Sequence, residues 1–443
     1  MTAGIHGHML KTVQSMYSVL KSCVRINEQY TDWFSIGKGV RQGENLAPTL
    51  FALFINDLVP EINALGCGVL LENDFSLSTL LYADDIVFIS SSAAGLQTQL
   101  DTLNNWSRRW RLNVNIDKTK VLHVRKATVA RSEFVFKIGD KIVDYTSQYR
   151  YLGLTVSETL DYNISVNELI TGSSRALGSL VSKYYSTDGF DYDTYTKLFE
   201  STVAPIMTYC AGVWGFKAYE GLDKLQNRAI RSFLGVGKFT PIPGMTGEMA
   251  WIPVSIRNHC QMIKLWCRIV NMHSERLPSR IYAWDCSFSR NHKDTWYNNI
   301  KSIMNESGLD TLFNSKCTDG LSTKFISNFA KDMLMQKYQI TWEKAVEAMP
   351  KLRTYRDLNT TYSVQPYLKS GISRHERSAI ARLRCGVFPL EIEKGRYRGV
   401  PADRRLCKVC RTGSVEDEKH FLITLSYLFV TEKSHVYGLS TEI

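Results

Sequence analysis

The 443-residue sequence lacks several features that would assign a protein to a class at once. Residues 1–7 have neither the basic start nor the apolar centre of a secretory signal, so we expect a protein that is not secreted. No apolar run reaches the roughly 18 residues of a membrane helix, which excludes a spanning helix. Internal repeats with a period of about 20–50 residues and low-complexity tracts are also missing, which excludes a solenoid.

The cysteines and the charge balance narrow the class further. The ten cysteines are scattered, and only Cys407 and Cys410 have a ligand-like spacing, which predicts a reduced, intracellular protein with mostly free, buried thiols. The chain holds 54 Lys and Arg against 43 Asp and Glu, a net charge of +11. Such a charge favours an anionic partner such as nucleic acid, although many soluble proteins are mildly basic.

The most informative motif is an acidic pair, Asp84 and Asp85, between two apolar runs at 77–81 and 86–89. An apolar run, a short acidic break and a second apolar run predict a β-hairpin with two carboxylates at its tip. Close carboxylates repel one another unless a cation lies between them, and a hard cation such as magnesium suits oxygen ligands. Most Asp-Asp pairs are solvated turns, but the apolar flanks predict a hairpin that is buried on at least one side.

A pass along the chain predicts a mixed part followed by a mainly helical part. Helical spacing of apolar residues and strand-like stretches alternate up to about residue 157. The strand-like stretches include Tyr151–Val156. Breaks are expected at Pro278 and near Asp285, and residues 290–370 are too polar and weakly periodic to predict an element. The fold class that follows is α+β.

Several motifs in this order resemble the C-terminal part of a reverse transcriptase from a non-LTR retrotransposon. Gly39–Gly43 (GVRQG) with 48–51 (PTLF) resembles the second palm motif of that family, and Leu81–Asp85 (LYADD) its metal-binding motif. Leu112–Lys120 resembles the motif after the next helix, and Tyr151–Gly153 (YLG) the primer-grip strand. Stretches at 203–215 and 222–226 are similar to the thumb and connecting region.

The resemblance implies a role for each site residue. Asp84 would be the main ligand and Asp85 an auxiliary ligand of two magnesium ions, which stabilise the attacking 3′-oxygen and the departing pyrophosphate. Arg41, Gln42 and Gly43 would face the template and the incoming nucleotide. Lys118 matches the position that supplies a proton to pyrophosphate; a solvated basic strand edge explains it equally well. The implied partners are an RNA template and a DNA primer or target, which would place the protein in the nucleus.

The family's first palm motif, with its metal-binding aspartate, has no counterpart in the sequence. Asp32 and Asp57 are the acidic candidates before the hairpin, and each comes after the expected place. We therefore expect a truncated palm at 1–157, a helical thumb and connecting region at 158–285, a mainly helical region at 286–395 and a zinc-knuckle-like segment at 396–430. An N-terminally truncated reverse transcriptase without activity of its own is one hypothesis. A non-catalytic nucleic-acid-binding remnant is the alternative.

The C-terminal segment resembles the zinc knuckle of these elements. Cys407, Cys410 and His420 have metal-ligand spacing, but Leu425 stands where the family has its last cysteine. Structural zinc and two free cysteines beside a surface histidine are both left open. From Arg374 to Arg411 there are 11 Lys and Arg against 4 Asp and Glu. This basic segment predicts contact with phosphates, and a solvated helix face is the alternative. The sequence does not decide the oligomeric state.

Overall fold

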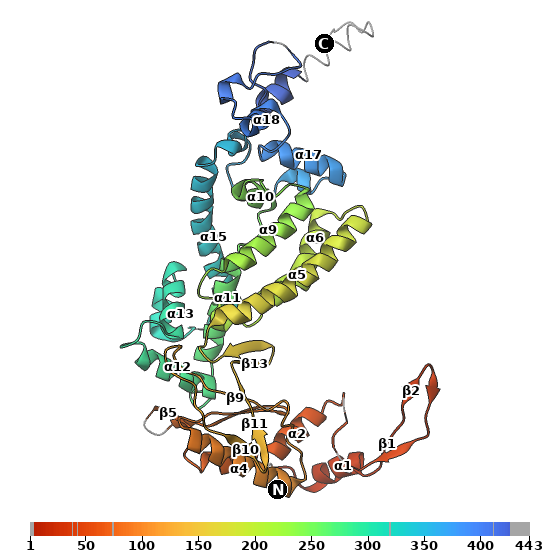
Figure 1. Cartoon of the computed structure of the whole chain (residues 1–443), viewed down its shortest axis with the longest axis vertical. Helices are drawn as coiled ribbons and strands as arrows, with labels where there is room; N and C mark the ends of the chain where they lie inside the picture. The colour runs from red at the N-terminus through yellow and green to blue at the C-terminus, as the bar shows by residue number, and fades with distance from the viewer. Residues whose placement is uncertain are drawn as a thin grey trace. The chain divides into compact units, whose positions relative to one another are not determined.

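The computed structural model describes residues 4–37, 39–41, 43–72, 75–318, 320–410 and 412–425. The chain divides into two compact units: Met1–Tyr149 with Ser157–Leu160, and Arg150–Val156 with Asp161–Ile443. Within the described residues, strands occur between Leu20 and Ser157, and helices make up nearly all of the second unit (Figure 1). The mixed helix-and-sheet class that the sequence predicts is confirmed.

The first unit contains short helices and short strands. Its helices are α1 (Gly7–Tyr17), α2 (Ala47–Ile55), α3 (Leu58–Asn63) and α4 (Ala93–Trp110). Its strands are β1 (Leu20–Ser22), β2 (Arg25–Ile26), β3 (Gln29–Tyr30), β4 (Phe34–Ile36), β5 (Val69–Glu72), β6 (Phe75–Leu77), β7 (Thr79–Tyr82), β8 (Asp85–Phe88), β9 (Val121–Leu122), β10 (Phe136–Ile138), β11 (Lys141–Val143) and β12 (Tyr145–Thr146). Every sheet in the described part of the chain has two strands. Strands β9 and β12 pair in parallel. The pairs β1–β4, β2–β3, β5–β6, β7–β8 and β10–β11 are antiparallel.

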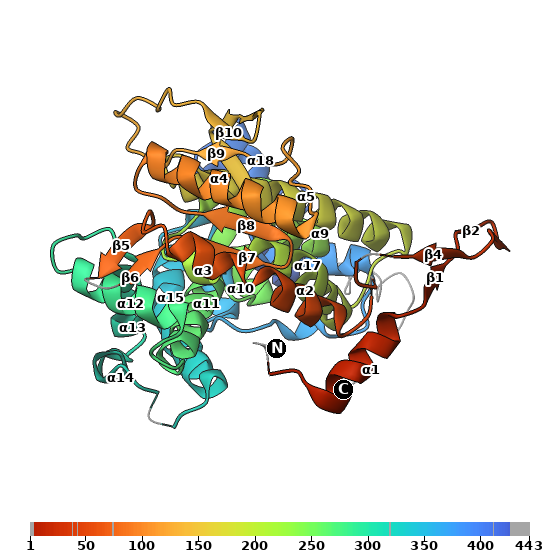
Figure 2. The ribbon, with the colours of Figure 1, turned by 90° about the horizontal axis from the view of Figure 1, so that it is seen from below.

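Helix α4 forms the centre of the first unit because its apolar residues recur every three or four positions. Ser92 begins the helix by accepting a hydrogen bond from the Gly95 amide at 3.1 Å. Trp106 is 1% exposed, and its indole N–H donates to Asp57 Oδ1 at 2.9 Å. Figure 2 shows α3 and α4 beside the β7–β8 hairpin. The core thereby supports the hairpin from one side, with contributions from α2, α3, α4, β9, β10 and β11.

The second unit is built from helices. They are α5 (Tyr162–Ser186), α6 (Tyr192–Leu198), α7 (Ala204–Met207), α8 (Ala211–Trp214), α9 (Glu220–Leu234), α10 (Ile242–Met249), α11 (Val254–Val270), α12 (Leu277–Phe288), α13 (Trp296–Glu306), α14 (Asp310–Ser315), α15 (Thr323–Glu347), α16 (Tyr355–Leu358), α17 (Arg374–Arg384) and α18 (Glu391–Tyr397). A π-helical turn, Phe199–Val203, joins α6 to α7. Strands β13 (Gln148–Tyr151) and β14 (Leu154–Ser157), which precede α5, form a hairpin.

Two large apolar clusters hold the second unit together. One packs α5, α6 and α9 around Tyr195 and Phe233, and the other packs α11, α13 and α15 around Trp266. Arg377 of α17 fastens the C-terminal part to the first cluster: its Nε donates to the Phe233 carbonyl at 3.2 Å, and its guanidinium lies 4.1 Å from the Phe233 ring centroid. This arginine also stabilises the C-terminal end of α9, because a cation near the last carbonyls of a helix complements the helix dipole.

Three expectations are wrong in detail. Tyr151–Val156 is not one strand, because Leu152 and Gly153 have φ of 48° and 85° and form the turn between β13 and β14. Helix α12 runs through Asp285, so no break occurs there. Residues 290–370, for which the sequence predicted no individual element, include the 25-residue helix α15; its apolar side chains face several neighbours and so lack one clear stripe. The cysteines are free, as expected, but only Cys260, Cys267, Cys385 and Cys407 are buried.

Candidate active site

The acidic hairpin is confirmed by the pairing of β7 with β8. Leu81 pairs with Ile86 and Tyr82 with Asp85, so Ala83 and Asp84 form a two-residue turn. Ala83 has φ of 52°, a value that tight hairpin turns require at such a position and that costs a non-glycine residue about 1 kcal/mol. The turn therefore places one aspartate at the tip and the other at the first position of β8.

Burial divides the hairpin into two parts. Leu81, Ile86 and Phe88 pack against the core of the first unit, so the hairpin is covered on one side, as predicted. Asp84 and Asp85 are exposed at the tip. Their carboxylates are thus accessible to a cation and to a phosphate-bearing ligand.

Within the described residues, no third acidic or histidine side chain joins Asp84 and Asp85 in a three-ligand group. Asp57 is held by Trp106 through the bond given above, and Asp32 is exposed in the segment between β3 and β4. Among the described strands, β7 and β8 also pair only with each other. Two carboxylate oxygens suit magnesium, but a fixed cage needs more ligands than this pair supplies.

The glycine-containing loop before α2 lies against the end of α1. Arg41 Nη2 donates to the Met16 carbonyl at 2.9 Å, and its guanidinium lies 5.9 Å from the ring centroid of Tyr17. Gly39 and Gly43 have φ of 87° and 88°, a region that favours glycine. Gln42 lies outside the described residues. One N–H group of Arg41 is therefore bound at the end of α1. Because the side chain is exposed, its other N–H groups face solvent.

Lys118 lies in a turn between α4 and β9. Its amide donates to Asn115 Oδ1 at 3.2 Å, and its carbonyl accepts from the Tyr149 hydroxyl at 3.2 Å. Lys120 differs, because its ammonium pairs with Asp144 at 2.8 Å. Among the described residues, Lys118 has no ion-pair partner, and neither Lys118 nor Arg41 forms a hydrogen bond or ion pair with the two aspartates.

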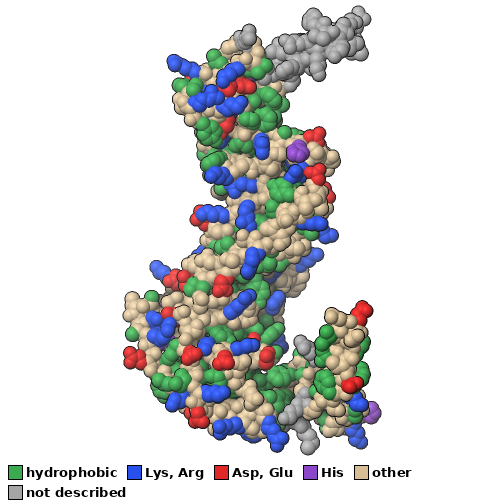
Figure 3. All heavy atoms as spheres, turned by 45° about the vertical axis from the view of Figure 1, so that its right-hand side comes forward, with side chains coloured by type: hydrophobic (Ala, Val, Ile, Leu, Met, Phe, Trp, Pro, Cys, Tyr) green, Lys and Arg blue, Asp and Glu red, His purple; other side chains and the backbone are tan. Residues whose placement is uncertain are grey.

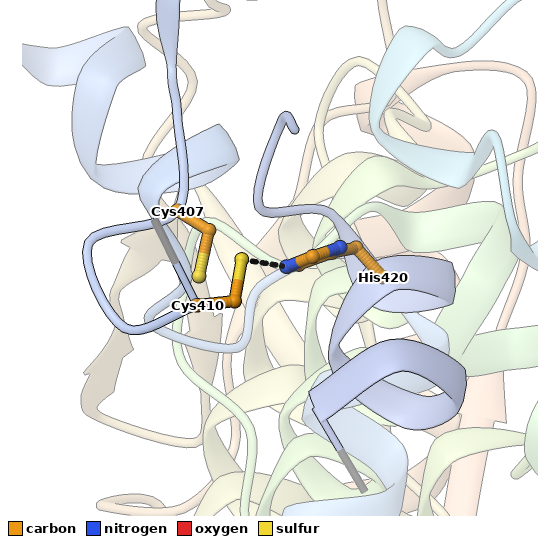
Figure 4. Close-up of side chains that lie close together, drawn as sticks. All are labelled: Cys407, Cys410 and His420. Carbon is orange, nitrogen blue, oxygen red and sulfur yellow. Dashed lines mark hydrogen bonds between the residues drawn. The ribbon is translucent and has the colours of Figure 1, made fainter. Parts of the chain in front are cut away.

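The C-terminal segment brings Cys407, Cys410 and His420 together, as Figure 4 shows. Their ligand atoms lie within 4.8 Å of one another, and Cys410 Sγ is 3.3 Å from His420 Nε2. The cluster fits zinc, whose bonds to sulfur and imidazole nitrogen are about 2.0–2.3 Å long. Hydrogen bonds from Thr412 lower the pKa of the Cys410 thiol to about 7, which favours the thiolate that a metal requires.

A short ladder of backbone hydrogen bonds between residues 405–407 and 414–416, together with a buried carboxylate, holds this cluster in place. The Cys407 amide donates to the Ser414 carbonyl at 2.8 Å. Glu418, 2% exposed, accepts hydrogen bonds from Arg353 at 2.6 Å and from the Thr354 hydroxyl at 3.0 Å. The segment is therefore anchored to the residues that precede α16. Neither of these anchor contacts has a signal in the local cysteine and histidine spacing.

Much of the basic segment serves the fold. Arg377 is buried, and Arg384 pairs with the fully buried Glu248 at 3.0 Å. Arg398 and Lys408 both pair with Glu391, at 3.4 and 3.2 Å. Figure 3 shows the Lys and Arg side chains that gather on the surface of this part of the second unit, among a few acidic ones. The excess of 11 over 4 charged residues therefore overstates the charge available to a ligand.

Comparison with known proteins finds relatives over the part of the chain that contains the hairpin and its flanking motifs. The family described as "Reverse transcriptase (RNA-dependent DNA polymerase)" matches residues 5–156. A "Probable RNA-directed DNA polymerase from transposon BS" of Drosophila melanogaster is 30% identical over 232 residues, which are 49% of this chain. Over residues 5–156 the chain is therefore similar to the reverse transcriptases of transposons.

Two further relatives of this family are an "RNA-directed DNA polymerase from mobile element jockey" of Drosophila funebris and a "Retrovirus-related Pol polyprotein from type-1 retrotransposable element R2" of Popillia japonica. They are 28% and 24% identical over 45% and 35% of this chain. The chain spans about a quarter of the length of these reverse transcriptase relatives, at 22–26%. Among its described helices, none combines the length and apolar character needed to cross a membrane.

Proposed function

We propose that residues 5–156 carry part of the active site of an RNA-directed DNA polymerase, with Asp84 and Asp85 as magnesium ligands. The observation that supports this most directly is the exposed carboxylate pair on a hairpin whose other side packs into the core. Magnesium ions, when bound, would stabilise the attacking 3′-oxygen and the leaving pyrophosphate. The core keeps Asp84 and Asp85 in a fixed place, so metal ligands would be oriented before substrate binds.

The same geometry supports the proposal that residues 1–443 do not polymerise DNA alone. Asp84 and Asp85 lack a third carboxylate partner within the described residues, and catalysis by two metal ions needs a fixed cage. Lys118, exposed and without an ion pair, is proposed to contact the phosphates of the nucleotide. Arg41, Gln42 and Gly43 are proposed to lie near template and nucleotide.

Primer extension on an RNA template tests these proposals. The purified chain with magnesium is expected to give no extended primer. If the gene encodes an aspartate-bearing strand upstream of Met1, the longer chain is expected to extend the primer. That activity should fall at least a hundredfold on Asp84→Ala, because the ligand acts directly on the reacting phosphate. Extension by residues 1–443 that survives Asp84→Ala would overturn the assignment of the hairpin.

We further propose that the C-terminal segment binds zinc through Cys407, Cys410 and His420 and contacts nucleic acid, the RNA template or the DNA primer or target. Support comes from the convergence of three side chains that suit zinc, two cysteines and one histidine, on an anchored ladder beside exposed basic residues. The zinc content of the purified chain, measured with and without Cys407→Ser, tests the first part. About one zinc per chain is expected, and equal content in the two proteins would contradict it.

Nucleic-acid binding without catalysis is the second candidate function, and the incomplete carboxylate set favours it. It predicts RNA binding that weakens as salt rises, because released counterions drive phosphate contacts. Binding of a labelled RNA at 50 and 200 mM KCl separates the cases. Salt-independent affinity would contradict an electrostatic contact.

A further inference from the structure

Helix α12 carries a stripe of two arginines and three aromatic rings at a spacing of four residues. The stripe consists of Arg276, Arg280, Trp284, Phe288 and His292. Residues four apart are neighbours on a helix surface, with a rise of about 6 Å between them. The stripe begins at Arg276, the residue before α12, and ends at His292, four residues after the helix.

The three rings form a continuous parallel stack. Trp284 and Phe288 have centroids 4.9 Å apart and planes 21° apart, and Phe288 and His292 are 3.7 Å and 4° apart. Phe288 is 38% exposed and His292 is exposed. Among the described residues, Phe288 is the one ring stacked on His292. A parallel stack that ends at an exposed ring can be extended by another flat group.

The end of the stack is held in position by α13. His292 Nδ1 lies 3.1 Å from the Phe288 carbonyl oxygen, which fixes the ring over the helix end. Asn298 donates to the carbonyls of His292 and Lys293 at 3.0 and 3.2 Å. A stack that is already ordered loses little conformational entropy when a ligand adds to it.

The charge around the stack is positive. Arg290 and Lys293 flank His292 and are exposed, and Arg276 stands exposed at the other end of the stripe. The exposed Glu275 and Asp294 stand directly outside Arg276 and Lys293, and Asp285 is the one acidic residue between them. The Asp285 Oδ2 accepts a hydrogen bond from the Tyr297 amide at 2.7 Å, and partial burial raises the pKa of Asp285. Four Lys and Arg against three carboxylates over residues 275–294 leave a small positive excess, which favours an anionic ligand over a basic one.

We propose that the stripe on α12 is a binding platform for single-stranded nucleic acid. A base stacks on the outer face of His292 and continues the column of rings, and Arg290 and Lys293 contact the adjoining phosphates. Flat aromatic groups with flanking cations bind single strands in a sequence-tolerant way.

The residues of this platform belong neither to the hairpin nor to the cysteine–histidine cluster, and crosslinking reports on these residues directly. Binding of an unstructured 12-nucleotide fluorescent RNA to residues 1–443 is measured by anisotropy, and contacts are located by ultraviolet crosslinking and mass spectrometry. We expect crosslinks within 284–293. Phe288→Ala and His292→Ala should each weaken binding about five- to tenfold, as loss of one stacked base does.

Phe325→Ala is the matched control, because Phe325 is also exposed, at 56%, but stacks on no ring among the described residues. It should change affinity less than twofold. Phe288→Trp keeps a stacking surface and should keep wild-type affinity, and Arg290→Gln should lower the salt slope by about one. Circular dichroism verifies that each variant is folded.

The proposal fails if His292→Ala and Phe288→Ala, both folded, bind RNA as tightly as Phe325→Ala. It also fails if crosslinks lie only outside 284–293. Finally, poly-L-glutamate at equal charge should not displace these crosslinks. If it does so as well as unlabelled RNA, then the platform recognises charge alone and the stacking assignment is wrong.

Discussion

Replacing Glu418 tests how the cysteine–histidine cluster is held. Glu418 is 2% exposed, and its two oxygens accept from Arg353 and Thr354. Glu418→Ala leaves a buried hydroxyl and a guanidinium without their acceptor. A charged hydrogen bond contributes about 1.5–3 kcal/mol, and an orphaned buried group costs about 1–3 kcal/mol. Because Arg353 keeps a side-chain exposure of 27%, water recovers part of this loss. We expect the anchor to weaken by about 2–3 kcal/mol.

Hydrogen exchange of metal-free protein measures the loss locally. The amides of Cys407 and Glu416 bond to Ser414 and Arg405 at 2.8 and 3.0 Å, so both exchange only when the ladder opens. A loss of about 2–3 kcal/mol should accelerate their exchange about 30- to 150-fold.

The control is Lys419→Ala, one residue away. Its ammonium pairs with Asp357 at 2.7 Å, but the two side chains are 61% and 57% exposed. Such an exposed pair contributes little because water screens it, so exchange should change about twofold or less. Equal acceleration in the Glu418 and Lys419 variants would refute the buried anchor.

Further predictions concern the second unit. Gly247→Ala should destabilise the chain by about 2 kcal/mol or more in a thermal melt, because the added Cβ would lie 2.4 Å from Trp342. Gly178→Ala should instead raise stability by about 0.5–1 kcal/mol, because nothing lies within 4 Å of that position on α5; a loss there would contradict the reasoning. Burial lowers the pKa of His259 in the folded chain. The unfolded chain then binds more protons as pH falls below about 6.5, so stability should fall toward pH 5, and less so in His259→Gln; an equal fall in both proteins would exclude this histidine.

The sequence predicted the hairpin well because its signal is local. Two apolar runs and an acidic break set the strands, and a two-residue turn needs no distant contact. The exposure of Asp84 and Asp85 could not be predicted, because it depends on which face of the hairpin α4 covers. Tyr151–Gly153 shows the opposite problem: its apolar pattern hides a turn that the positive φ of Leu152 and Gly153 creates.

Charge was the least predictable property of the site. Arg377 and Arg384 stand in a basic run that predicts a ligand surface. Each instead contacts a residue far away in the sequence, Arg377 the Phe233 carbonyl and Arg384 the Glu248 carboxylate. The stripe on α12 was also missed, although its four-residue spacing is readable. The break expected near Asp285 divided this stripe between two segments. The stacking of its rings becomes visible only because α12 continues through Asp285.

The central claim is that Asp84 and Asp85 form a divalent-cation site at the hairpin tip. Manganese-induced broadening of the Ala83 methyl signal tests it most directly, because Ala83 lies in the turn beside both carboxylates. The account predicts broadening in the wild-type chain that is lost in the double variant Asp84→Asn, Asp85→Asn. Broadening of the Ala83 signal that persists in the double variant, or none in the wild type at millimolar manganese, would contradict the claim.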